Sequence, residues 1–240
     1  ILYGAFGIAL FLITWEVLGR NRVFGLSWPA LSDTIAMLHK RSDLYQRASA
    51  ATFSKAAIAY VIGGILGLCF AALVHIVVGL RPGIDRLSSF LHAIPAIALA
   101  PIFMVLINRE YVGMAIATLN VYFVIYIAAT SGLNNSTKAH RDLFSVLGAN
   151  KIRRLISLDM PAALPPVVTG LRYAVSAALI GSIIGEWFGA SRGIGVLIFA
   201  SMQNFQIALL WGAVLLVALV SLLLYGLISL VERLIYARFT

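Results

Sequence analysis

The chain has 240 residues, of which 61% are hydrophobic and only 11% are charged, with a net charge of +9. A soluble domain carries about a quarter charged residues, so this composition excludes an ordinary water-soluble protein and indicates one solvated by lipid. The basic residues fall between apolar runs, where they match anionic lipid headgroups. The lipid bilayer therefore accounts for the positive charge, and nucleic acid is not an expected partner.

Six apolar runs are each long enough for a helix of about 20 residues to cross the roughly 30 Å hydrocarbon layer. None of them alternates as a membrane β-strand does, and a helix satisfies its own backbone hydrogen bonds in lipid. The sequence therefore predicts an all-α membrane bundle that forms a single domain over residues 1–240. The predicted spans lie near residues 2–19, 56–79, 90–107, 112–131, 173–190 and 207–231.

The first run does not resemble a cleaved signal peptide, because no basic segment precedes it and Trp15 and Glu16 end it. Since the chain opens at Ile1, we expect further residues upstream. Six spans place both termini on one side of the membrane. If that side is the cytoplasm, the inner loops hold ten Lys and Arg residues and the outer loops eight, which slightly favours cytoplasmic termini.

The loop between the first two spans, about residues 20–55, is long and contains the helix-like stretch SWPALSDTIAMLHKRSDLYQR. We expect an interfacial helix there that leads into the second span, with Ser32 as its N-cap.

The third predicted span contains two prolines, Pro95 and Pro101, in the stretch HAIPAIALAPIF. Each proline removes a backbone donor, so we expect this helix to be kinked or interrupted. Broken helices in transporters often expose backbone groups to a solute. A kink that serves packing alone is an equal alternative.

A polar, basic segment follows the fourth span, from about residue 134 to 169, and includes SVLGANKIRRLISLDMPAALPPVVTGLR. Its pattern predicts two helical pieces separated at Gly148, with a stop at the prolines from Pro161 onward. In the first piece Leu143, Phe144 and Leu147 share one helical face. That face either docks another protein or packs back on the bundle of its own chain.

Small residues recur at every fourth position of the second and fifth predicted spans, a pattern that lets helix backbones approach closely. In the fifth span they serve either bundle packing or a solute pathway, and both interpretations stay open. Glu186 either reaches the membrane interface beside Trp187 or faces the cavity, and Asn120 bonds either a neighbouring helix or a solute. The predicted pathway residues are Pro95, Asn120, Gly181, Ser182, Gly185 and Glu186.

The stretch DLFSVLGANKIRRLISLDMPAALP resembles the EAA loop of ATP-binding-cassette (ABC) importer permeases. That motif has Glu-Ala-Ala, three residues, a Gly, and a Pro thirteen residues later. Asp142 stands at the Glu position, Gly148 at the Gly and Pro161 at the Pro. The departures are Leu143 and Phe144, which replace the two alanines and imply a differently shaped pocket on the partner, and Leu158 with Met160, where the family usually has Ile and Leu.

The resemblance covers about residues 56–235, is specific, and is to the permeases grouped with sulfonate, taurine and nitrate uptake. LHAIPAIALAPIF is similar to their third span, and PAALPPVVTGLRYAVSAALIGSIIGEWFGASRGIGVLI to their fifth span and the loop after it. The segment GEWFGAS is more similar to relatives that import pyrimidine-type vitamin precursors. The family therefore implies a small polar solute, which we expect to be a sulfonate or taurine, nitrate, or such a precursor.

The resemblance also implies a type I ABC importer permease fold in a bacterial inner membrane, with both termini cytoplasmic. The implied partners are a second permease, which we expect to be a homodimer copy, two cytoplasmic ATPase subunits that bind ATP and Mg, and an extracytoplasmic solute-binding protein. Gly148 would make a turn that a side chain would obstruct. The implied ATPase-coupling residues are Asp142, Leu143, Phe144, Leu147, Gly148, Ala149 and Pro161.

The sequence does not indicate an enzyme, a metal site or a bound cofactor. It contains no HExxH, no GxxxxGK[ST] phosphate loop and a single cysteine, Cys69, so we expect ATP hydrolysis in a separate chain. The alternative is an ATP-independent secondary transporter or channel, which usually carries ionisable residues at mid-membrane or an internal repeat. The requirement for a separate ATPase distinguishes the two.

Overall fold

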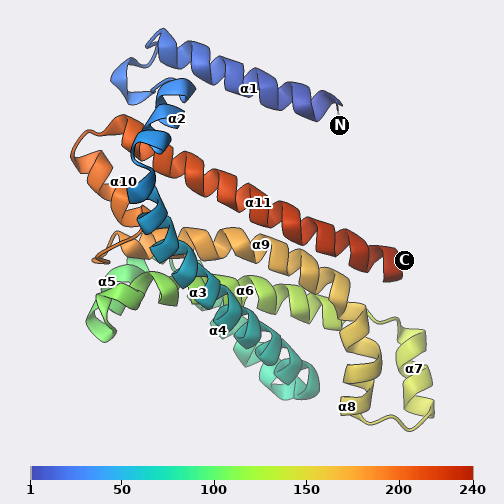
Figure 1. Ribbon diagram of the computed structural model, residues 1–240. Helices are drawn as coiled ribbons and strands as arrows, with labels where there is room; N and C mark the ends of the chain where they lie inside the picture. Colours follow the sequence, from blue (N-terminus) through green and yellow to red (C-terminus); the bar gives the residue numbers. More distant parts are fainter. Residues whose placement is uncertain (1, 240) are drawn as a thin grey trace.

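The computed structural model describes residues 2–239, and in this part of the chain helices are joined by short connections without any strand. Helices α6 (Val112–Leu133) and α9 (Met160–Glu186) form the centre of the bundle and run in opposite directions (Figure 1). Helix α3 (Ser42–Ile76) crosses α6, and α11 (Ile207–Phe239) lies along α9. The short helix α10 (Ile194–Gln203) connects the ends of α9 and α11.

The central helices approach closely because glycines lie at the contacts between them. A Cβ atom built at Gly63 of α3 would lie 2.6 Å from the carbonyl oxygen of Thr118, and one built at Gly181 of α9 would lie 2.5 Å from the Cα atom of Ala117. At Gly185 it would overlap the backbone of α6. The small residues of the second and fifth predicted spans therefore serve helix packing in this structure.

Four of the described helices are long and apolar enough to span a membrane: Ser42–Ile76, Arg109–Leu133, Lys151–Glu186 and Ile207–Leu234. A bent pair of helices forms at most a fifth span. Helix α1 (Leu2–Arg20) covers the first predicted span but is not among these candidates. The prediction of an all-α membrane bundle is confirmed, whereas the count of six spans is not.

The interruption expected in the third span occurs at the residue before Pro95. Helix α4 (Arg81–Ala93) is followed by Ile94, whose backbone is extended, and α5 (Ala96–Leu106) is bent by 98° from it. A proline disfavours the helical conformation of the residue before it, which explains why the chain turns there. Residues 90–107 are therefore not a single straight span, although Pro101 stays within α5.

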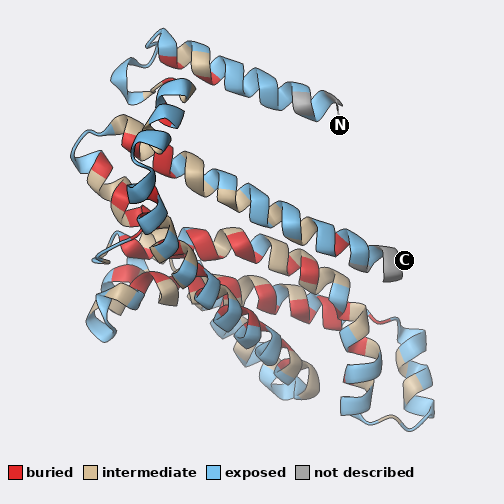
Figure 2. Cartoon of the chain, viewed as in Figure 1, coloured by how far each residue is buried: buried red, intermediate tan, exposed pale blue. Residues whose placement is uncertain are grey.

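The N-terminal helix joins the bundle through aromatic side chains. Trp15 of α1 packs against Trp28 and Trp211, with ring centroids 5.8 and 5.2 Å away. Most other side chains of α1 are exposed, as are many on α11 (Figure 2). In a lipid bilayer such apolar faces contact acyl chains or another membrane subunit.

The expected interfacial helix is present as α2 (Leu31–Lys40), but its cap differs from the prediction. Ala30 holds the N-cap position and provides no side-chain bond. Ser32 instead donates its backbone N–H and its hydroxyl to the carboxylate of Glu16, at 2.9 and 2.8 Å. The tertiary contact with α1 therefore decides the role of Ser32.

The polar middle segment is a hairpin that projects from one end of the bundle. It contains α7 (Lys138–Val146) and α8 (Lys151–Arg154), and a π-helical turn (Leu155–Asp159) leads from α8 directly into α9. The stop predicted at the prolines is wrong, because the helix that begins in α8 continues through Pro161 at the start of α9. Pro165 and Pro166 stay within that helix, so the loop is shorter than predicted.

The hairpin shares its end of the bundle with the start of α1 and the end of α11 (Figure 1). The α4–α5 bend, the α9–α10 connection and the α10–α11 connection lie toward the other end (Figure 1). The two ends of the bundle therefore present different structures to the two sides of the membrane.

Candidate functional site

The tip of the hairpin is a turn whose conformation depends on Gly148. The φ angle of Gly148 is +72°, in the left-handed region. The N–H of Gly148 donates to the carbonyl oxygen of Ser145, and the N–H of Ala149 donates to that of Phe144, both at 3.0 Å. These two bonds form a Schellman motif, a common C-terminal cap of a helix. A Cβ atom at position 148 would meet nothing within 4 Å. The expected turn is present, but glycine is needed for its conformation and not for space.

The tip carries an apolar surface with no cover from the rest of the described chain. Val146 and Leu147 are 86% and 71% exposed, and Leu143 is 54% exposed. We refer to these three side chains as the apolar tip. Phe144 is half-buried, and Asp142 is exposed without a hydrogen bond or ion pair to any described residue. The alternative that this helix packs its apolar face back on the bundle is therefore wrong for the apolar tip.

The root of the hairpin contains a buried carboxylate, that of Asp159. The hydroxyl of Ser136, in the turn between α6 and α7, donates to it at 2.8 Å. Nε2 of His75, at the end of α3, lies 2.8 Å from the same carboxylate, and Nε of Arg154 in α8 lies 3.4 Å away. A single side chain thus connects three segments that are distant in sequence.

Asp159 was not among the residues predicted from the sequence, although a signal was present. An isolated acid in the apolar stretch LISLDMPAAL needs a buried partner when the segment folds against lipid or protein. Its partner His75 is 84 positions away, and no local pattern connects the two.

The predicted pathway residues of α9 lie in contacts between helices. Gly181 and Gly185 pack against the backbone of α6, and the carbonyl oxygen of Ser182 lies against Gly113. Ser182 is fully buried, and its hydroxyl has no hydrogen-bond partner among the described residues. A role of these residues beside a pathway stays a prediction, since their contacts here are with α6.

Asn120 borders that cluster, since a Cβ atom built at Gly181 would lie 3.1 Å from its Nδ2 atom. Asn120 is half-buried in α6 and lines a small cavity with Ser88, His92 and Tyr122. Pro95 is exposed at the α4–α5 bend. The structure therefore places Asn120 beside Gly181 of α9, whereas Pro95 is exposed at the bend.

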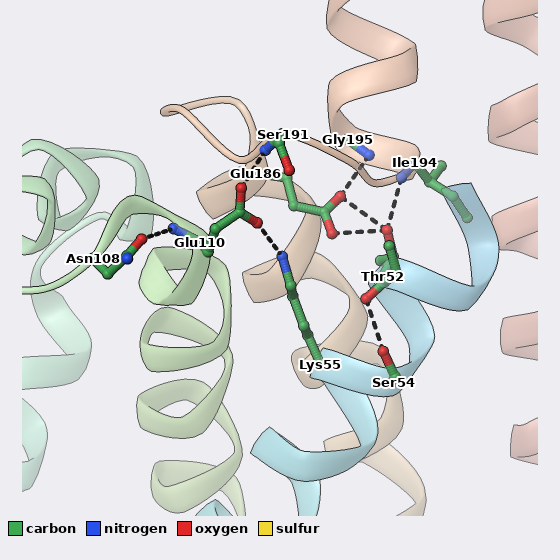
Figure 3. Close-up of polar contacts among 10 residues, drawn as sticks. Thr52, Ser54, Lys55, Asn108, Glu110, Glu186, Ser191, Ile194 and Gly195 are labelled. Carbon is green, nitrogen blue, oxygen red and sulfur yellow. Dashed lines mark hydrogen bonds and ion pairs between the residues drawn. The ribbon is translucent and has the colours of Figure 1, made fainter. Parts of the chain in front are cut away.

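Glu186 is buried, so the expectation that it reaches the interface beside Trp187 is wrong. Its carboxylate accepts the hydroxyl of Thr52 at 2.8 and 2.9 Å and the N–H of Gly195 at 2.8 Å (Figure 3). The oxygen of Thr52 also accepts the N–H of Ile194 at 2.7 Å. This network joins α3, α9 and α10 at the end of the bundle away from the hairpin.

A second carboxylate, that of Glu110, lies beside this network (Figure 3). It accepts Nζ of Lys55 at 2.9 Å and the N–H of Ser191 at 2.7 Å. Asn108 caps the turn that carries Glu110, accepting its N–H at 3.0 Å. The connection from α9 to α10 is thus held to both α3 and the start of α6.

Comparison with known proteins adds an independent result. Residues 59–240 match the family of binding-protein-dependent transport system inner membrane components. The chain is 28% identical over 223 residues to a probable ABC transporter permease protein of Haemophilus influenzae, covering 91% of this chain and 90% of that protein. It is 26% identical over 231 residues to the formylaminopyrimidine transport permease protein ThiX of Halalkalibacterium halodurans, covering 94% and 91%.

A third relative is the putative aliphatic sulfonates transport permease protein SsuC of Bacillus subtilis, 23% identical over 230 residues, which cover 94% of this chain and 83% of that protein. The family match spans most of the helical bundle, including the hairpin and its root. The chain therefore belongs to the family of binding-protein-dependent transport system inner membrane components, and it is a permease subunit of an ABC importer.

Proposed function

We propose that the hairpin is the element by which this permease docks a cytoplasmic ATPase subunit, which holds ATP and Mg. The observation that carries this proposal is the apolar tip, which no other part of the described chain covers. Exposed apolar side chains on a projection outside the helical bundle are typical of a protein-docking surface. The spacing of Asp142, Gly148 and Pro161, which matches the EAA pattern, supports the same assignment.

The assembly that we propose contains two copies of this chain, two ATPase subunits and an extracytoplasmic solute-binding protein. The exposed apolar faces of α1 and α11 suit lipid and a second permease. The hairpin, the start of α1 and the end of α11 lie at one end of the bundle, which supports cytoplasmic termini in a bacterial inner membrane (Figure 1). The opposite end, with the network of Glu186 and Glu110, then faces the binding protein.

The transported solute in this proposal is small and polar. The named solutes of the relatives, aliphatic sulfonates, formylaminopyrimidine and nitrate, support the classes expected from the sequence. Closure of the ATPase subunits on ATP would move the docked hairpins together and switch the bundle between inward-open and outward-open states. We assign the pathway to the central helices, with Asn120 and the four predicted α9 residues as its candidate borders.

The experiment that tests docking is affinity purification of the permease in mild detergent from its native host, followed by mass spectrometry. The Leu147→Asp variant places a charge on the apolar tip, where the side chain is exposed and the fold does not depend on it. The matched control is Leu26→Asp, which changes a 76% exposed leucine near the opposite end. We expect an ATPase subunit with wild type and control, and at least a tenfold lower recovery with Leu147→Asp. Equal recovery from both variants would contradict the proposal.

A further inference from the structure

The polar contacts between the hairpin and the bundle converge on the surroundings of Asp159. Arg141 of α7 donates to the carbonyl oxygen of Ser136 at 2.9 Å, and the hydroxyl of Ser136 donates to Asp159 at 2.8 Å. Lys151 at the start of α8 donates to the carbonyl oxygen of Ile76 at 3.5 Å, next to His75. Both arms of the hairpin are therefore fastened at one place, between the end of α3 and the start of α9.

Burial makes this point of attachment strong. The side chain of Asp159 is 0% exposed, and a buried carboxylate without partners is strongly disfavoured. Its partners His75, Ser136 and Arg154 come from α3, the α6–α7 turn and α8, so separating any of these segments leaves the carboxylate less well bound. Buried Leu155 packs in the same region, against the ends of α3 and α6.

The backbone at this point is also unusual. Residues Leu155–Asp159 form a single π-helical turn between α8 and α9. A π-helical turn accommodates one residue more than an α-helical turn, and such turns occur often at functional positions. Without a fastening, a helix can change its register or direction at such a turn. The bonds of Asp159 hold the last residue of the turn in place.

We propose that Asp159 is the positioning residue that makes the hairpin move as one body with α3 and α6. This inference rests on the proposed docking role of the hairpin. Asp159 lies at the root, away from the apolar tip, so it acts through its partners on the spans and not on the ATPase. When the tip is displaced, the carboxylate transmits the displacement to His75 on α3 and, through Ser136, to the end of α6.

The test uses the permease with its ATPase subunits in lipid nanodiscs and two spin labels, introduced by Arg153→Cys on α8 and Val78→Cys after α3, in a Cys69→Ser background. Both labelled positions are exposed. Labelled chains are diluted with unlabelled chains, so that only distances within one chain are measured. The distance is compared without nucleotide and after trapping with ATP, Mg and vanadate.

In the wild type we expect one distance that does not change on trapping, because hairpin and α3 move together. In Asp159→Asn we expect a broader distribution that shifts on trapping, while recovery of the ATPase subunit stays at the wild-type level. Glu232→Gln is the matched control, because it removes a buried carboxylate of α11 whose bonds to described residues go to Thr169 and Arg172 of α9. We expect it to destabilise the protein without a shift on trapping.

If Asp159→Asn does not fold, His75→Gln removes one partner and should give a smaller shift in the same direction. If the variant is folded and binds the ATPase but its distance does not change on trapping, the proposed role of Asp159 is overturned, whereas the docking proposal is not. Failure to recover an ATPase with the wild type would overturn the docking proposal and the transmission that depends on it. A purely structural role predicts a less stable protein, as in the control, with a distance that does not depend on nucleotide.

Discussion

Substitution of Gly181 by alanine tests whether the small residues of α9 serve helix packing. The added Cβ atom would lie 2.5 Å from the Cα and 2.7 Å from the backbone nitrogen of Ala117. Carbon atoms in contact are about 3.5–4.0 Å apart, so α6 and α9 must separate by about 1 Å. Overpacking of this kind costs about 1–3 kcal/mol. The better helix propensity of alanine returns about 0.5–1 kcal/mol, so we expect a net destabilisation centred on about 1 kcal/mol.

The assay is thermal unfolding of the detergent-solubilised permease. After heating to each temperature, size-exclusion chromatography measures the fraction of protein that remains soluble. The matched control is Gly226→Ala in α11, where a Cβ atom would meet nothing within 4 Å. We expect the control to be as stable as the wild type or slightly more stable. A Gly181→Ala protein as stable as this control would refute the packing argument. If its transport also changed, the residue would border the pathway instead.

Three further predictions concern other contacts. Gly148→Ala should destabilise the turn by about 1–2 kcal/mol, because φ is +72° there, and lower ATPase recovery while thermal unfolding of the bundle stays unchanged. Thr52→Val should lower the stability by about 3 kcal/mol or more in the same unfolding assay. The carboxylate of Glu186 loses a hydroxyl donor, and the buried N–H of Ile194 loses its acceptor. The double variant Arg172→Leu, Glu232→Leu should unfold at a higher temperature than the single variant Glu232→Leu. The single variant leaves the partly buried Arg172 without its carboxylate partner.

The sequence predicted a helix well where hydropathy alone determines it. The fourth predicted span, 112–131, nearly coincides with α6 (Val112–Leu133), because a long apolar run in lipid has no alternative to a helix. The prediction failed at the ends of other elements. Helix α3 begins at Ser42, well before the second predicted span, because its polar first turns pack beside α2 and α10. Hydropathy detects the part of a helix in lipid and not its extension beyond the membrane.

In the candidate site, too, some features could be predicted from the sequence and others could not. The turn at Gly148 and the exposed Leu143 and Leu147 could be predicted, because both follow from local pattern and spacing. The burial of Glu186 could not be predicted, because its donors come from Thr52 on another helix and from the following loop. Polar groups choose partners across the fold, and one sequence does not show which ones meet.

By itself, the sequence determined that this protein is a helical membrane bundle with a projecting polar hairpin, because hydropathy and backbone hydrogen bonding leave no other solution in lipid. The spacing of its loop motif also indicated the importer family, because that motif lies within one short segment of the chain. Only the tertiary structure decided that Gly181 packs on Ala117, that the chain turns by 98° at Pro95, and that Asp159 fastens the hairpin to His75. These outcomes depend on which surfaces meet in three dimensions, since close packing and buried charge are satisfied by neighbours in space and not by neighbours in sequence.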